Sequence, residues 1–457
     1  MARIDTLGHF LTDVADAIRT KKGSGSTIQA SSFDTEIASI PSGGGEAVEK
    51  KDINFYDYDG TILHSYTKSE FNNLQAMPDN PTHEGLTSMG WNWTLEEAKT
   101  YLTHHNYLEI GQQYKTDDGK TRIYVSLSEF TLNPYVSIGI NGTATIDWGD
   151  NTTSTITGSS ISTPVDTQHT YSSAGDYVIT IYSTSNIYNA EGTNYRSKLF
   201  WSGGDTESEN TPYLSSVTKI EFSDNFSINY TYGLNKLYNL KSLILPYNNG
   251  NLKNYSLSYC SNLKHLTIPR TGTYYSQYVF ERCFNLKSVS LPATMTNTGN
   301  YMFAYCYSLE RITMPDTLNY MGTYTFRDNY SLKIVEYSTS QTSVNSSTFY
   351  NTHSLKEIYL PSNVANIQGS AFNLTYSLGK VTASPTSISS NGFVGCVNTM
   401  IFDFTGCSSV PSMSSTGFPA TLKTGCKIIV PDDLYDTWIT KQAWVNLTDY
   451  IVKESEA

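Results

Sequence analysis

Residues 303–315 read FAYCYSLERITMP, and the same pattern of apolar positions returns with a fixed 23-residue period. One aliphatic column holds Val217, Leu240, Leu263, Leu286, Leu309, Leu332, Leu355 and Leu378. A second follows three residues later, from Ile220 to Val381, and its members are followed two residues on by a further, mostly apolar column. This spacing predicts one short strand per repeat. Another apolar column runs through Leu234, Leu257, Phe280, Phe303, Phe326, Phe349 and Phe372. Because a single repeat this short cannot bury an apolar face alone, the repeats must stack into one solenoid core.

Composition and charge narrow the classes of function. The chain has 457 residues, which predicts several domains, and its net charge is −12 with 16% charged residues. This argues against a nucleic-acid partner, since phosphates require clustered Lys and Arg. No apolar run is long enough to span a membrane, and Asp5, Asp13 and Asp16 interrupt any signal-peptide core. The 35 Tyr nevertheless give the chain the composition of an extracellular protein.

Three of the six cysteines lie in phase with the repeat. Cys260, Cys283 and Cys306 each come three residues before the aliphatic column, and later repeats hold Asn329, Thr352 and Thr375 there. Stacked coils place neighbouring cysteines about 5 Å apart, which is within disulfide reach. Because the position accepts Asn and Thr equally well, we expect free, buried thiols instead.

Composition divides the chain into five segments, and the predicted fold class is mainly β and multidomain. Short N-terminal helices followed by a glycine linker occupy 1–45, as a docking or oligomerisation segment. A small α+β unit follows at 46–122, a β-sandwich at 123–186, the solenoid at 187–425 and a C-terminal cap at 426–457. Within the solenoid segment, residues 187–212 lack periodicity and are expected to be loop.

Local signals predict elements in the α+β unit and the cap. We expect a strand at 53–56 and helices at 69–75 and 95–104. Thr94 and Glu97 form a capping box for the second helix, and Trp91 and Trp93 are expected to anchor the unit's core. Residues 428–431 predict a strand, and the segment with Trp438 and Trp444 predicts a short capping helix.

The repeat pattern resembles the BspA-like leucine-rich repeats. That family follows F-x-x-C-x-x-L-x-x-I-x-L-P, and the proline is matched at Pro246, Pro269, Pro292, Pro315 and Pro361, with Ser338 as a departure. The resemblance implies a leucine-rich-repeat solenoid of the kind found in surface proteins that bind host molecules.

Two further resemblances concern the segments before the repeats. The segment DWGD at 147–150, which contains a WGD turn, resembles the PKD family of immunoglobulin-like domains, as do HTY at 169–171 and AGDY at 174–177, with Asn151 departing from the usual glycine. That family supplies spacers or binding modules on extracellular surfaces. The N-terminal segment and the α+β unit, with DYDGTILHSY at 57–66 and GWNWTL at 90–95, resemble tail or baseplate proteins of phages that infect gut Firmicutes. This implies a location in the virion; an extracellular or cell-surface location is the alternative.

Catalytic motifs are weak, and we predict no enzymatic activity, no cofactor and no metal. DYDGT at 57–61 matches the first motif of haloacid dehalogenase-like phosphatases, but the segment is too short for that fold, so a hairpin turn is expected. Asp147 and Asp150 are expected to form turns, with a Ca²⁺ site in the sandwich left open. No HExxH or GxSxG pattern is present.

Aromatic residues also keep the repeat register, and they are the candidate binding residues. One column, two positions before the Phe column, holds Tyr232, Tyr255, Tyr278, Tyr301 and Tyr324. Another, two positions before the Leu column, holds Tyr238, Phe284, Tyr307, Tyr330, His353 and Tyr376. Stacked coils would set these rings about 5 Å apart as ladders. Binding surfaces favour Tyr with Ser, Gly and Asn, although the rings could instead only knit neighbouring coils together.

These observations predict a phage receptor-binding protein that recognises a host-cell surface glycan or protein through its solenoid. Residues 1–45 would contact other tail or baseplate proteins, and the chain is expected to form a homo-oligomer whose several copies raise avidity. The alternatives are a bacterial or prophage-encoded surface adhesin, and a structural tail component without receptor binding.

Overall fold

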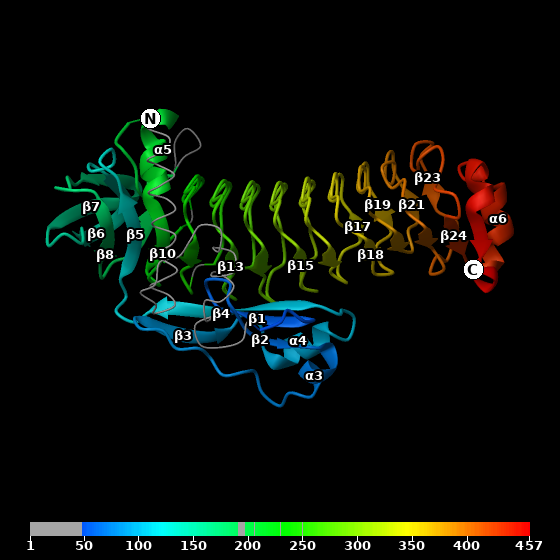
Figure 1. Cartoon of the computed structure of the whole chain (residues 1–457), viewed down its shortest axis with the longest axis horizontal. Helices are drawn as coiled ribbons and strands as arrows, with labels where there is room; N and C mark the ends of the chain where they lie inside the picture. The colour runs from blue at the N-terminus through cyan, green and yellow to red at the C-terminus, as the bar shows by residue number, and fades with distance from the viewer. Residues whose placement is uncertain (1–47, 191–196, 205, 229, 249) are drawn as a thin grey trace, which may run out of the picture. The chain divides into compact units, whose positions relative to one another are not determined.

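The computed structural model describes residues 48–190, 197–204, 206–228, 230–248 and 250–457. The predicted N-terminal helices and linker at 1–45 lie outside the described residues. Residues Lys51–Ala457 form one compact unit, and that unit is described below (Figure 1).

The repeats form a solenoid in which each coil contributes one short strand to a parallel face (Figure 1). Paired strands keep the repeat period, as Leu266 opposite Val289 and Ile358 opposite Val381 show. Val381 pairs in turn with Phe402, two positions earlier than the period would place its partner, so this shortened repeat keeps its register. The strands are β12 (Ser242–Ile244), β13 (His265–Thr267), β14 (Ser288–Ser290), β15 (Arg311–Thr313), β16 (Ile334–Glu336), β18 (Glu357–Tyr359), β20 (Lys380–Thr382), β22 (Ile401–Asp403) and β24 (Lys427–Val430).

A second, shorter parallel face runs along the other strands of the coils. It consists of β17 (Ser343–Val344), β19 (Asn366–Ile367), β21 (Ser387–Ile388) and β23 (Ser412–Met413). Earlier coils continue it as isolated bridges in which Asn297 pairs with both Tyr274 and Tyr320. Between the faces the predicted apolar columns are buried, and the Phe column stacks ring on ring, with 5.2 Å between the centroids of Phe280 and Phe303.

All six cysteines are free and buried, which confirms the expected thiols in the repeat column. The Cys283 thiol donates to the carbonyl of Leu257 at 3.2 Å, and Thr375 donates to the carbonyl of Phe349 at 3.0 Å from the same position of a later coil. Cys306 and Thr352 donate in the same way, whereas Asn329 instead accepts from the backbone N–H of Cys306. In most coils the position therefore holds a small donor, because a buried carbonyl there needs a partner.

A mostly antiparallel sheet closes the first coil. Its strands are β5 (Thr121–Leu127), β6 (Tyr135–Asp147), β7 (Thr153–Gln168), β8 (Gly175–Tyr182) and β9 (Ile187–Asn189). β5 pairs with β10 (Val217–Glu221), which pairs in turn with β12 of the solenoid. These strands, with β11 (Phe226–Ser227), belong to one sheet rather than two, because the long β6 pairs with β7, β8 and β9. The resemblance to PKD domains stays a prediction.

The sheet and the solenoid share one hydrophobic core, which extends from Ile123 to Ile451. The sequence boundary at 186–187 therefore marks no break in packing. In the turn after β6, Asp147 accepts from the backbone N–H of Gly149 at 2.9 Å and Asp150 from that of Thr152 at 3.1 Å. Both aspartates thus form turns, as the sequence predicts.

The α+β unit has a four-stranded sheet in the order β2-β1-β4-β3. Its elements are β1 (Ile53–Tyr56), β2 (Ile62–Tyr66), α3 (Lys68–Asn72), β3 (Leu86–Trp91), α4 (Leu95–Tyr101) and β4 (Leu108–Thr116). The predicted capping box of Thr94 and Glu97 is formed, and Trp91 and Trp93 are buried in the unit's core. Both helices end about three residues before their predicted ends, and tight turns through Thr103 and His104 continue from the second.

The expectation that residues 187–212 form only a loop is wrong in part. Besides β9, helix α5 (Glu207–Ser216) begins there, and Thr206 and Glu209 form its capping box. Pro212 inside the helix and the lack of an apolar stripe concealed it from pattern analysis.

The cap matches the predicted strand and short helix. β24 is followed by η2 (Asp432–Leu434), α6 (Tyr435–Thr440) and η3 (Val445–Tyr450), and Trp438 and Trp444 are fully buried. A last strand, β25 (Ile451–Lys453), pairs with β24 before η4 (Glu454–Glu456) and was not predicted.

Candidate functional site

The α+β unit lies across part of the solenoid's main strand face (Figure 1). Strand β4 contacts β12, β13, β14 and β15 in turn. The ring of Tyr56 stacks on His265, with 4.7 Å between the centroids. Gly111 approaches so closely that a Cβ there would overlap the side chains of Thr267 and Ser290. The covered strands are accordingly buried at all three positions.

Hydrogen bonds connect the unit to the carbonyls of the coils. The Asn92 amide donates to the carbonyls of Ile268 and Ser290, at 3.2 and 2.9 Å. The Trp93 indole donates to the carbonyl of Leu291 at 2.7 Å. Buried carbonyls at the ends of the coil strands and just after them thus accept hydrogen bonds from the α+β unit.

Two ion pairs cross the same interface. Arg311 lies 3.2 Å from Glu109, whose side chain is fully buried. Arg270 donates two hydrogen bonds to Glu97, at 2.6 and 2.8 Å. The Arg270 hydrogen bonds are the main cause that lowers the pKa of Glu97 to about 2.

His105 joins the unit to two successive coils. Its Nε2 lies 3.0 Å from Asp316 and its Nδ1 lies 3.0 Å from Glu336, while its ring stacks on Tyr101. Burial lowers the His105 pKa, but the hydrogen bonds that its ring donates to both carboxylates outweigh burial and leave the pKa raised. The backbone N–H groups of Asn106 and Tyr107 also donate to Glu336.

Beyond this contact the strand face is open. The outer positions of β18 and β20 are exposed or half-buried, and Tyr359 is 62% exposed. Figure 1 shows the coils from β18 onward continuing past the α+β unit. The surface open to a ligand is therefore confined to the later coils on this face.

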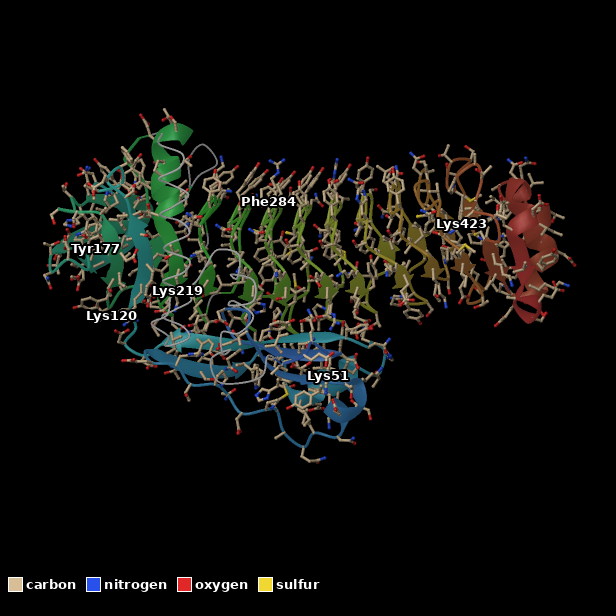
Figure 2. The ribbon with its side chains drawn as sticks, in the orientation of Figure 1. Lys51, Lys120, Tyr177, Lys219, Phe284 and Lys423 are labelled. Atoms are coloured by element: carbon tan, nitrogen blue, oxygen red, sulfur yellow. The ribbon has the colours of Figure 1, made fainter. Side chains whose placement is uncertain are left out.

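The predicted ladder of Phe284, Tyr307, Tyr330, His353 and Tyr376 is formed. Successive ring centroids are 5.0, 4.9, 4.9 and 5.7 Å apart. Phe284 lies at the edge of the coils away from the α+β unit (Figure 2). Tyr330 and Tyr376 are about two-fifths exposed, at 39% and 42%.

Tyr238 does not join this ladder, which corrects the sequence prediction. The intervening coil has Ser261 in the same column, so two coil spacings separate Tyr238 from Phe284. The Tyr238 ring packs instead against the hydrophobic core.

The second predicted ladder, from Tyr232 through Tyr255, Tyr278 and Tyr301 to Tyr324, is also formed. Its ring centroids are 4.9, 4.4, 4.8 and 4.5 Å apart, and every ring is half-buried. All five residues have φ between 57° and 60°, a left-handed conformation that costs a side-chain-bearing residue about 1 kcal/mol. Later coils place Ser347, Ser370 and Asn391 in the same conformation.

A third ladder was missed by the sequence analysis. The Arg282 guanidinium lies 5.0 Å from the ring centroid of Tyr259 and 5.1 Å from that of Tyr305. Arg327 lies 6.0 Å from Tyr305 and 4.9 Å from Tyr350. The column Lys236, Tyr259, Arg282, Tyr305 has the 23-residue spacing and was the available signal.

The stacking of the rings determines which parts of the predicted ladders a ligand can contact. A ring inside a ladder has a neighbour on each face at about one coil spacing, so its faces are covered. Ring edges and phenolic hydroxyls remain. The ladders therefore suit edge contacts and hydrogen bonds, not the stacking of sugar rings.

The phosphatase-like aspartate has a structural role. Asp57 accepts from the Tyr114 hydroxyl at 2.6 Å and lies 2.7 Å from His83, while the Gly60 N–H donates to its carbonyl in a tight turn. This confirms the expected turn. Within the described ranges, no group of three or more His, Cys, Asp or Glu side chains could hold a metal ion.

The repeat region matches a known family. Residues 212–310 and 273–400 match the model described as "BspA type Leucine rich repeat region", so these coils are leucine-rich repeats of BspA type. No curated protein matches the chain. In the part that the structure describes, no helix combines the length and apolarity needed to cross a membrane.

Solved leucine-rich-repeat structures resemble part of the chain. A protein from Bacteroides ovatus is 18% identical over 43% of this chain and 65% of its own length, with a TM-score of 0.29. The T. pallidum leucine-rich repeat protein is 17% identical over 43% of this chain and 86% of its own, also at 0.29. The pneumococcal vaccine antigen PcpA is 14% identical over 60% and 84%, at 0.25.

Proposed function

We propose that this chain is a receptor-binding protein of a phage tail that adheres to a bacterial surface glycan or protein. The solenoid supplies the binding surface, and the α+β unit and the β5–β9 sheet hold that surface rigid. Binding is non-covalent, and several copies on one particle would raise avidity without new contacts.

One observation carries this proposal: the coil does not require the aromatic residues that it displays. Ser261 occupies the column of Tyr330 and Tyr376 in an earlier coil, and the aliphatic and Phe columns fill the core without these rings. Half-exposed Tyr beside Ser and Asn is the composition of binding surfaces such as antibody paratopes. Because a serine suffices at this surface position, the presence of aromatic rings there favours a role in recognition.

The BspA-type repeats favour a second candidate, a bacterial or prophage-encoded surface adhesin. Its binding surface would be the same, and only the carrier differs. Antibodies against the chain distinguish the two, because they would label purified phage tails in one case and the bacterial envelope in the other.

The test is binding of the full chain to intact cells of a panel of gut Firmicutes. The triple variant Tyr307→Ser, Tyr330→Ser, Tyr376→Ser is compared with Tyr274→Ser, Tyr320→Ser. The control tyrosines are similarly exposed, at 50% and 48%, but lie on the second strand face.

Strain-selective binding that the triple variant loses and the control keeps supports the proposal. Equal binding by both variants rejects the ladder as the binding site. Binding to no strain favours a structural tail component. The full chain is required because a fragment beginning at residue 187 would lack β5, the partner of β10.

A further inference from the structure

A groove lies where the α+β unit ends on the strand face. It has a volume of about 300 Å³ and is bounded by the connection between α4 and β4 on one side and by β16, β18 and β20 on the other. The lining residues that bear on a ligand are Lys333, Glu336, Glu357, Tyr359 and Lys380. The groove continues the interface that His105 and Glu336 fix, so both of its walls are held in place.

We propose that this groove is a saccharide-binding subsite in which Tyr359 stacks against the apolar face of an uncharged sugar ring. The inference rests on the proposed function and adds the place and ligand class of one contact. It differs from the ladder surface in chemistry, because stacking on a sugar needs an open aromatic face.

Tyr359 provides such a face. It is the most exposed tyrosine of the described solenoid residues, and its neighbours in the same column of the adjacent coils are Glu336 and Thr382, not rings. Within the described residues its ring makes no stacking contact. A rigid ring with a hydroxyl gives contact area at low entropic cost.

The other side chains match a neutral polyhydroxyl ligand. Glu357 and Lys380 are exposed, and their side chains form no hydrogen bond or ion pair within the described residues, so an acceptor and a donor lie beside the ring in the same groove. Lys333 and Glu336 add one further charge of each sign, so the four charges cancel. A balanced groove does not favour a polyanion or a polycation, whereas sugar hydroxyls can pair with both signs. The volume lies at the lower end for ligand pockets and suits one or two sugar rings.

The test uses the full chain and saturation-transfer NMR with a panel of soluble neutral saccharides: glucose, galactose, mannose, rhamnose, N-acetylglucosamine and their short oligomers. Tyr359→Thr removes the ring with little risk to folding, because Thr267, Thr313 and Thr382 occupy the same column in other coils. Tyr359→Phe keeps the ring, and Tyr320→Ala is the control on the other face.

We expect at least one saccharide to bind, with about tenfold weaker binding by Tyr359→Thr and near-native binding by Tyr359→Phe and Tyr320→Ala. No binding across the panel, or binding that survives Tyr359→Thr, overturns the inference. Cell binding that persists in Tyr359→Thr without any saccharide signal rejects the subsite alone. Saccharide binding without binding to any cell rejects the adhesion proposal alone.

Discussion

Coils under the α+β unit and coils beyond it share a core but differ in what they present on the strand face. In β13 to β15 the outward positions hold small or paired residues, namely His265, Thr267, Ser288, Ser290, Arg311 and Thr313, and all are buried. In β18 and β20 they hold Glu357, Tyr359, Lys380 and Thr382, which are exposed or half-buried. The same repeat pattern thus provides an internal interface in the coils under the α+β unit and a solvent-exposed surface in the coils beyond it.

The difference shows that the α+β unit is an integral part of the solenoid. Serine and threonine let β4 approach the coils closely, and the charges that are buried there have partners. The inward-facing columns do not differ between the covered and the open coils, because the core needs the same Leu, Ile and Phe in every coil. Changes on the covered half should therefore affect stability, and changes on the open half should affect binding.

The largest effect is expected from Arg311→Met. The fully buried Glu109 would lose its cationic partner, and stranding a buried charge costs about 3–5 kcal/mol of unfolding free energy. Urea unfolding measures this loss. The matched control is Lys333→Met, whose pair with Glu310 is more than half exposed and should change stability by less than about 0.5 kcal/mol. Similar losses in both variants would contradict the buried interface.

Gly111→Ala comes next. Its added Cβ would overlap Thr267 and Ser290, so we expect about 2 kcal/mol of destabilisation and weaker docking of the α+β unit. Hydrogen exchange in β4 and β13 should accelerate. Gly175→Ala is the control, since the nearest atom to its Cβ lies at 3.6 Å. An unchanged exchange pattern in Gly111→Ala would mean that β4 does not rest on the coils.

The covered half should also respond to pH. The His105 pKa is raised above 6.5, so its contribution is full below about pH 6.5 and is lost as pH rises through the folded-state pKa. Glu97, with a pKa of about 2, contributes above its ordinary value of 4.5 and loses that contribution as pH falls toward 2. Urea midpoints measured from pH 5.5 to 9 should fall more steeply for the native chain than for His105→Gln. Parallel curves would exclude His105 as the cause.

Among the open coils, Tyr330→Ser should lower the free energy of unfolding by only about 1 kcal/mol. It loses two stacking neighbours at 4.9 Å, but Ser261 already occupies this column without disturbing the coil. The urea midpoint gives the value. A loss above about 3 kcal/mol would identify the ladder as part of the core.

The smallest effect is expected from Cys306→Thr. Its thiol donates to the carbonyl of Phe280 at 3.2 Å, as Thr352 does to that of Phe326 from the same position of a later coil, so stability should change by less than about 0.5 kcal/mol. Cys306→Ala should cost about 1–3 kcal/mol, because that buried carbonyl would lose its donor. Equal losses would show that volume, not the hydrogen bond, selects the residue.

Periodicity made the solenoid predictable. Columns at 23-residue spacing require one register, and that register places the Leu and Phe columns inside and the aromatic columns in ladders. The capping box of Thr94 and Glu97 and the buried Trp438 and Trp444 followed from local patterns in the same way.

Long-range contacts were not predictable. Nothing in one repeat indicates that β4 will cover β12 to β15, because that contact depends on complementary shapes far apart in sequence. The isolated charges Glu109 and Arg311 gave no sign of pairing. The groove at Tyr359 was missed for the same reason, since its two walls come from residues 104–107 and 333–382.

The most direct test of the division between covered and open coils is hydrogen exchange of the full chain with and without the cell envelope of a strain that it binds. We predict new protection at β18 and β20 and around Tyr330 and Tyr376, with no change in β13 to β15. Protection confined to the β5–β9 sheet, or appearing in the covered strands, would contradict adhesion through the open surface of the solenoid.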